Sequence, residues 1–267
     1  MKIQSLRIAA AVLVLLSVAS AQDWAREELE KSPRRQEWVQ IQNGDRTVDT
    51  FVVFPEGSAK APVVLVLHDV QGMTEYVQNV ADQLAAHGYI AIAPDFLSGM
   101  GPSHGNSFAF FDHRQAQEAN TKLPSEQVMA DLNAVADLAK TIPAGNGKLA
   151  VVGFGWGGTQ SFNFVTRRSD LDAAFVFGGM APTDAAELGK IKAPVYDFFG
   201  GNDTRVSAAV PKTTEMMKQA GKTYEPVSYE GAGPNFMLNA EAPYPSTFDK
   251  EAHDKSWDRM LSVLKGM

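Results

Sequence analysis

The fold of this chain is decided by Leu149-Ala-Val-Val-Gly-Phe-Gly-Trp-Gly-Gly-Thr159. The apolar residues at its start are typical of a buried parallel strand, and the residues from Thr159 onward are typical of a helix. Gly153 and Gly157 flank Gly155 at equal spacing, where a strand and a helix that nearly touch leave room only for small residues. The stretch therefore predicts a nucleophile elbow, the strand–turn–helix motif G-x-Nuc-x-G.

The centre of this motif, where a Ser or Cys nucleophile belongs, holds Gly155. A nucleophile needs a hydroxyl or thiol that a neighbouring base activates, and glycine has no side chain. Glycine does adopt the strained elbow backbone at little cost. The alternative is a glycine-rich nucleotide loop, because Gly153, Gly155 and Gly158 match G-x-G-x-x-G. That loop belongs to an N-terminal βαβ unit, whereas this stretch lies mid-chain, so we favour an elbow without its nucleophile.

Residues 1–21 have the features of a secretory signal peptide. A basic start is followed by the apolar run from Ile8 to Val18 and by the A-x-A cleavage site Ala19-Ser20-Ala21. The alternative is an uncleaved anchor, but the apolar run is short for a bilayer span, which needs about 20 residues. We expect cleavage before Gln22 and export of the mature protein, which would then be periplasmic or secreted.

Charge and composition disfavour several classes of function. The net charge is −7, and loss of Lys2 and Arg7 with the signal peptide lowers it by two to −9, because residues 1–21 contain no acidic residue. An acidic protein is a poor candidate for binding nucleic acid. The absence of cysteine excludes a disulfide framework and a thiolate metal site. No later segment is long enough to span a membrane.

Apolar runs and helical patterns alternate along the rest of the chain. Residues 22–37 are charged and predict an N-terminal tether or a surface helix. Residues 38–42 and 47–54 alternate around Asn43-Gly44, which predicts a β-hairpin. Strands are then expected at 63–67, 89–93, 149–152, 173–177, 195–199 and 224–229, and helices at 74–87, 125–141, 159–168, 207–220 and 246–265. The alternation predicts one α/β domain over residues 38–267, a mostly parallel sheet with helices on both faces.

The segment 98–122 shows little periodicity, and a long irregular stretch inside a compact domain is often functional. We expect a loop or small helix over the mouth of the pocket. His104 and His113 of this segment could approach the pocket, but their spacing does not support a metal site. The sequence therefore predicts neither a metal nor a cofactor.

Five stretches together resemble one family. They are Val64-Leu-Val-Leu-His-Asp-Val-Gln-Gly72, Gly88-Tyr-Ile-Ala-Ile-Ala-Pro-Asp95, Gly153-Phe-Gly-Trp-Gly-Gly158, Gly200-Gly-Asn-Asp203 and Tyr229-Glu-Gly-Ala-Gly-Pro-Asn-Phe236. From about Trp38 to the C-terminus the chain resembles the dienelactone hydrolase family, which has the α/β-hydrolase fold. The resemblance implies that fold and, as the family activity, hydrolysis of carboxylic esters or lactones.

The resemblance also implies a catalytic triad of Cys, Asp and His in that chain order. The Cys position is Gly155, the Asp matches Asp203 just after a strand, and the His position is Pro234. Proline cannot accept a proton and glycine offers no nucleophile, so the family's usual mechanism cannot run here. Asp203 has an equal interpretation as a capping or turn residue. Ser161 is an unlikely substitute, because nearly two helical turns place it below the pocket mouth.

Other family positions bear on the ligand. The acidic residue of the first loop matches Asp69, one methylene shorter than the usual Glu, and the expected oxyanion donors are the backbone amides of Val70 and Trp156. The two arginines that hold a substrate carboxylate in dienelactone hydrolase would fall at Gly99 and Leu238. Their absence argues against that particular substrate, whereas backbone amides persist whatever the side chain.

Two hypotheses of different class follow. The first is a noncatalytic protein that binds a small ester, lactone or carboxylate at the vestigial pocket, whose amides attract oxyanions. The second is an active ester or lactone hydrolase that uses non-standard groups, for example Asp69 with a water. Fold alone does not decide between an enzyme and a binding protein, and the oligomeric state is left open.

Overall fold

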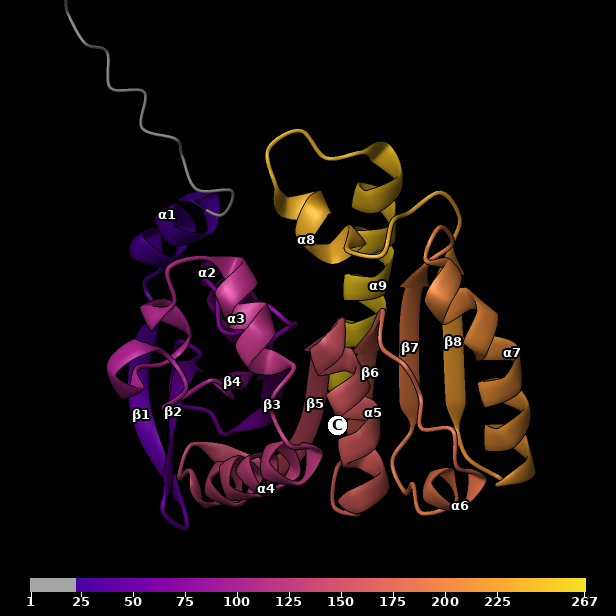
Figure 1. Cartoon of the computed structure of the whole chain (residues 1–267), viewed down its shortest axis with the longest axis horizontal. Coiled ribbons are helices and arrows are strands. Elements are labelled where there is room, and N and C mark those ends of the chain that lie inside the picture. Colours follow the sequence, from indigo (N-terminus) through magenta and orange to yellow (C-terminus); the bar gives the residue numbers. More distant parts are fainter. Residues whose placement is uncertain (1–22) are drawn as a thin grey trace, which may run out of the picture.

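An eight-stranded sheet forms the centre of the computed structural model, which describes residues 23–267 (Figure 1). Its order is β1-β2-β4-β3-β5-β6-β7-β8. The strands are β1 Arg35–Asn43, β2 Arg46–Phe54, β3 Ala61–Leu67, β4 Ile90–Pro94, β5 Gly145–Phe154, β6 Ala173–Phe177, β7 Val195–Gly200 and β8 Tyr224–Tyr229. β1 and β2 form the predicted antiparallel hairpin, β2 pairs antiparallel with β4, and every other neighbouring pair is parallel. The expected signal peptide lies outside the described residues.

Helices cover both faces of this sheet, as the sequence predicts. The larger ones are α2 Glu75–Ala86, α4 Ser125–Thr141, α5 Trp156–Arg167, α7 Thr204–Gln219 and α9 Thr247–Lys265; the shorter ones are α1 Asp23–Lys31, α3 His113–Asn120, α6 Ala185–Leu188 and α8 Phe236–Glu241. Alternate residues of β3 enter different cores, Leu65 with α4, α5 and α7, and Val64 with α2, α8 and α9. Residues of one strand point alternately to its two faces, so a continuous apolar run serves both cores.

The turn between β5 and α5 has the close packing that the glycine spacing predicts. Gly155 lies between the two elements with φ +53°, in the left-handed region that favours glycine. A Cβ added to Gly153 would lie 2.1 Å from the carbonyl oxygen of Gly157. A Cβ added to Gly157 would lie 2.4 Å from the carbonyl oxygens of both Leu67 and His68. The helix begins at Trp156, earlier than expected, because the tight turn outweighs the low helix propensity of the glycines.

The segment 98–122 does not cover the pocket mouth as expected. It forms 3₁₀ turns at Pro102–His104 and Ser107–Ala109 and then α3. Ser107 holds it in place by donating from its backbone N and its Oγ to the buried carboxylate of Asp95, over 2.8 and 2.7 Å. A buried carboxylate requires such donors, and this requirement draws the segment to the end of β4. None of the described helices is both long and apolar enough to cross a membrane.

We predict that Gly157→Ala lowers the free energy of unfolding by about 1–3 kcal/mol, the usual cost of overpacking. Alanine favours a helix more than glycine does, so a loss would come from the collision with the end of β3. Gly189→Ala is the control, because its Cβ would lie no closer than 3.4 Å to any neighbour. Urea unfolding of both variants measures the difference, and equal midpoints would contradict the packing assigned to this turn.

Candidate functional site

A small cavity opens at the carboxyl ends of β5 and β6, the edge of a parallel sheet at which ligands usually bind. Its volume is about 60 Å³. That is room for a few atoms, well below the roughly 300 Å³ of a typical ligand pocket. Gly155, Asp69 and Pro234 all line it, so three of the residues singled out in the sequence lie around one space. Four aromatic side chains complete most of the wall: Tyr76, Phe154, Phe177 and Phe236.

The Asp69 carboxylate accepts hydrogen bonds from the two expected oxyanion donors. Its Oδ1 accepts hydrogen bonds from the backbone N of Val70 and of Trp156, each over 2.7 Å. Trp156 is the first residue of α5, so the positive end of the helix dipole adds to the attraction. The sequence identified the acid and the donors separately, but nothing in the sequence showed that they pair with each other.

The same carboxylate fills the space that a nucleophile side chain would enter. A Cβ added to Gly155 would lie 2.3 Å from Asp69 Oδ1 and 2.6 Å from Oδ2. Both distances are far inside van der Waals contact, so Asp69 and a side chain at 155 exclude each other in this arrangement. The glycine therefore does more than permit the left-handed backbone, because it also makes room for Asp69.

His68 connects the backbone of Asp69 to that of Phe96. It is fully buried, and its Nδ1 lies 2.8 Å from the carbonyl oxygen of Asp69, while its Nε2 lies 3.1 Å from the backbone N of Phe96. A carbonyl only accepts and a backbone N only donates, so Nδ1 carries the proton and the ring is neutral. Burial lowers the pKa of His68, which agrees with this assignment. The ring of His68 also stacks on Trp156.

Asp203 caps α7 and lies beside the pocket rather than in its wall. Its Oδ1 accepts from the backbone N of Val206 over 3.1 Å, and its Oδ2 lies 3.7 Å from a guanidinium nitrogen of Arg205. Oδ2 is buried and accepts no hydrogen bond from the described residues. A Cβ added to Gly178 would lie 3.9 Å from this Oδ2 and 3.3 Å from the carbonyl oxygen of Pro234. Asp203 and Pro234 therefore both flank the end of β6, and β6 is hydrogen-bonded to the elbow.

Several other candidates lie away from the cavity. Neither His104 nor His113 is among its wall residues, and Ser161 is fully buried behind Gly153. Of the two positions at which dienelactone hydrolase has arginines, Leu238 lines the cavity and Gly99 does not. Among the described wall residues Asp69 is the only one with a formal charge.

A family model confirms the relationship that these residues indicate. The model of the dienelactone hydrolase family matches residues 48–267. The chain belongs to the dienelactone hydrolase family. The match includes the elbow, the Asp69 loop and the β8–α8 connection that carries Pro234.

Individual relatives and structures agree with this membership. A protein from Methylorubrum extorquens, provisionally named a carboxymethylenebutenolidase, is 28% identical over 234 residues, covering 83% of this chain and 78% of the relative. A protein from Escherichia coli K12 with the same provisional name is 27% identical over 214 residues, covering 76% of each chain. A provisionally named dienelactone hydrolase from Klebsiella pneumoniae has a similar crystal structure, with TM-score 0.76, 23% identity and coverage of 88% of this chain and 99% of that one.

A further similar structure is the dienelactone hydrolase-like promiscuous phosphotriesterase P91 from metagenomic libraries. Its TM-score is 0.72 at 20% identity, with coverage of 87% of this chain and 98% of that chain. At such identities the two crystal structures establish the fold of this family member and not its activity.

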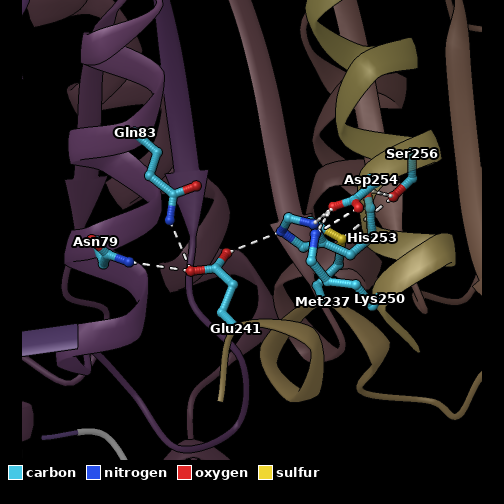
Figure 2. Close-up of polar contacts among 8 residues, drawn as sticks. All are labelled: Asn79, Gln83, Met237, Glu241, Lys250, His253, Asp254 and Ser256. Atoms are coloured by element: carbon cyan, nitrogen blue, oxygen red, sulfur yellow. Dashed lines mark hydrogen bonds and ion pairs between the residues drawn. The ribbon is translucent and has the colours of Figure 1, made fainter. Parts of the chain in front are cut away.

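The roof of the cavity is held in place by one carboxylate. Glu241 ends α8, whose first residues line the cavity, and its Oε2 accepts from Asn79 and Gln83 of α2 over 3.2 and 2.8 Å (Figure 2). Its Oε1 lies 3.1 Å from Nε2 of His253 on α9, and the other ring nitrogen lies 3.0 Å from Asp254. Burial alone would lower the pKa of His253, but hydrogen bonds to these two carboxylates outweigh it and raise the pKa above its ordinary value.

We predict that this contact makes stability depend on pH. A raised folded-state pKa means that His253 stabilises the protein fully below its unfolded pKa of about 6.5, and that this contribution is lost as the pH rises through the folded value. The native protein should therefore lose stability against urea as the pH rises from about 6.5 through the raised folded-state pKa of His253. His253→Gln should reduce that slope and the exposed-site control His87→Gln should not; an unchanged slope in His253→Gln would contradict the assignment.

Proposed function

We propose that this member of the dienelactone hydrolase family is a noncatalytic protein that binds a small molecule at its vestigial pocket. One contact carries the proposal, the pairing of Asp69 with the backbone amides of Val70 and Trp156. The family's hydrolases act on carboxylic esters or lactones, and such a reaction needs a nucleophile, a base and free donors for the oxyanion. Each of these three requirements is compromised here.

The oxyanion donors matter most for this proposal. They are backbone amides, which no side-chain substitution removes, so they are unavailable to a substrate only because Asp69 occupies them. An ester carbonyl would have to displace Asp69 from both amides before it could be polarised. Hydrogen bonds to a charged group contribute about 1.5–3 kcal/mol each, so the displacement is costly. A free carboxylate ligand would meet the same obstacle and would also face the charge of Asp69.

The missing nucleophile and base act in the same direction. Gly155 has no side chain, and Pro234 accepts no proton. The buried Oδ2 of Asp203, which has no hydrogen-bond donor among the described residues, is what the loss of a histidine partner at 234 would leave. Oxyanion and binding effects alone would contribute on the order of 10³-fold over water at best.

The alternative, an active hydrolase that uses Asp69 with a water, asks one carboxylate to do two things. Asp69 would have to activate the water as a base while it vacates the amides that must stabilise the oxyanion. In the observed arrangement Oδ1 serves those amides, so the geometry favours the noncatalytic function over this mechanism.

Restoring the catalytic groups tests the noncatalytic function. The native protein should show little or no hydrolysis of short acyl esters, no burst of product and no acyl-enzyme. Gly155→Cys with Pro234→His should gain little, because Asp69 occupies the space of the new thiol. Adding Asp69→Ala should then raise the rate by on the order of 10²-fold, the low end for a positioned general base.

The matched control is Asp69→Ala alone, which frees the amides but adds no nucleophile and should stay inactive. Ester hydrolysis is followed spectroscopically, and intact mass detects an acyl group on the triple variant. A burst and an acyl-enzyme in the native protein would refute the noncatalytic function. Activity of the double variant equal to that of the triple would show that Asp69 does not obstruct the site.

We also propose that the protein is exported, to the periplasm or outside the cell, after cleavage of residues 1–21. The basic start, short apolar run and Ala19-Ser20-Ala21 support this. Expression of the full chain followed by mass measurement should give a mature protein that begins at Gln22. Recovery of the intact N-terminus in the cytoplasm would contradict export.

A further inference from the structure

We propose that the cavity above Gly155 binds the ammonium group of a small primary amine, with Asp69 as its counter-ion. This inference rests on the noncatalytic function and names the chemical class of ligand at the same site. It departs from the family's ester and lactone substrates, which offer no positive charge for Asp69 to pair with.

One oxygen of the Asp69 carboxylate is available to a ligand. The backbone N atoms of Val70 and Trp156 both donate to its Oδ1. Its Oδ2 accepts no hydrogen bond from the described residues, and Asp69 forms no salt bridge with any of their lysines or arginines. Half of the carboxylate is thus satisfied by backbone dipoles, while the other oxygen has acceptor capacity left for an N–H donor.

The wall of the cavity around Asp69 is rich in aromatic side chains. Tyr76, Phe154, Phe177 and Phe236 line the cavity and form a continuous chain of ring contacts, with centroids 5.9, 5.2 and 6.3 Å apart in that order. None of the described residues that line the cavity carries a positive charge. An anion in an apolar wall is costly unless it is paired, and pairing with a cation from the ligand would remove that cost. Aromatic walls are also well suited to organic cations.

A second carboxylate, that of Glu241, adds to the negative charge that acts on the cavity wall. Burial raises the pKa of Tyr76 well above its ordinary value, and the negative charges of Glu241 and Asp69 raise it further. Tyr76 therefore experiences both carboxylates, one at the floor of the cavity and one on the roof helix α8. A second anion is disfavoured in this field and a cation is attracted to it.

The volume of the cavity limits which part of a ligand can enter it. A cavity of about 60 Å³ admits an ammonium group and one or two carbons. It does not admit a drug-sized ligand, for which pockets of at least about 300 Å³ are usual. A primary ammonium offers three N–H donors, and one of them suits Asp69 Oδ2. The remainder of a longer amine would extend out of the cavity.

The experiment titrates native protein with ethylammonium, ethanol and acetate, three probes of similar size that differ in charge. Backbone amide shifts of Gly155 and its neighbours report binding in the NMR spectrum. Ethylammonium should bind at least about tenfold more tightly than ethanol, a difference of roughly 1.4 kcal/mol, and acetate should not bind. Equal binding of ethylammonium and ethanol, or preferential binding of acetate, would overturn the inference.

Two variants assign the effect to Asp69. Asp69→Asn keeps an oxygen for the two amides but removes the charge, and it should weaken ethylammonium binding at least about tenfold. Asp258→Asn, exposed on α9, removes one charge away from the cavity wall and should leave the affinity unchanged. If both variants weaken binding equally, only the net charge matters and the site is not the one proposed.

The outcomes also separate this inference from the noncatalytic function. A native protein that neither hydrolyses esters nor binds ethylammonium would leave the noncatalytic function in place and remove the ligand class. A native protein that forms an acyl-enzyme would refute the noncatalytic function whatever it does with the amine.

Discussion

The pairing of the Asp69 carboxylate with two backbone amides is the constraint on which the site depends. It places an anion at the N-terminus of α5, over the α-carbon of Gly155. The elbow backbone, the glycine and the aspartate form one unit, because each requires the others. A side chain at 155 would expel Asp69, and without Asp69 the amides would face an aromatic cavity with no partner among the described residues. Leaving a buried backbone donor unpaired costs free energy, so the arrangement in which Asp69 accepts from both amides is favoured.

The unit is supported from two directions. Below it, the neutral His68 connects the loop that carries Asp69 to the loop after β4, through one donated and one accepted hydrogen bond. Above it, Glu241 joins α8 to α2 and to His253 of α9. His68 is buried and Glu241 is partly buried, and the polar atoms of each have hydrogen-bond partners, which favours a rigid arrangement. The roof therefore includes a histidine whose pKa is raised by its carboxylate partners.

The proposed loss of catalysis involves more than one side chain. Gly155 and Pro234 hold the positions at which the family resemblance places the nucleophile and the base, while Asp69 accepts hydrogen bonds from the two amides expected to bind an oxyanion. On this proposal the pocket no longer attracts developing negative charge, because it already contains an anion. A carboxylate ligand, attractive on the basis of free amides alone, is therefore expected to bind less well than a cation.

Much of this protein could be predicted from the sequence because the signals are local. Alternating apolar runs and helical patterns predicted the mostly parallel α/β sheet, and the spacing of Gly153, Gly155 and Gly157 predicted the tight strand-to-helix turn. Strand ends were less accurate, and β1 and β5 begin earlier than expected because neighbouring strands extend them by pairing. The sequence also places Gly155 and Pro234 where the family resemblance expects the nucleophile and the base, and the loss of catalysis inferred from them stays a prediction.

The tertiary structure alone decided what occupies the site. Asp69 and Trp156 are 87 residues apart, and their hydrogen bond depends on how β3 and β5 are aligned in the sheet. The segment 98–122 was expected over the pocket mouth, but Ser107 fixes it to the buried Asp95, and none of its residues lines the cavity. Helix α8 and its link through Glu241 were not predicted, because a short helix has little periodicity and its partners are distant in the chain. Sequence determines which groups are present and their local geometry, whereas long-range packing determines which of them meet.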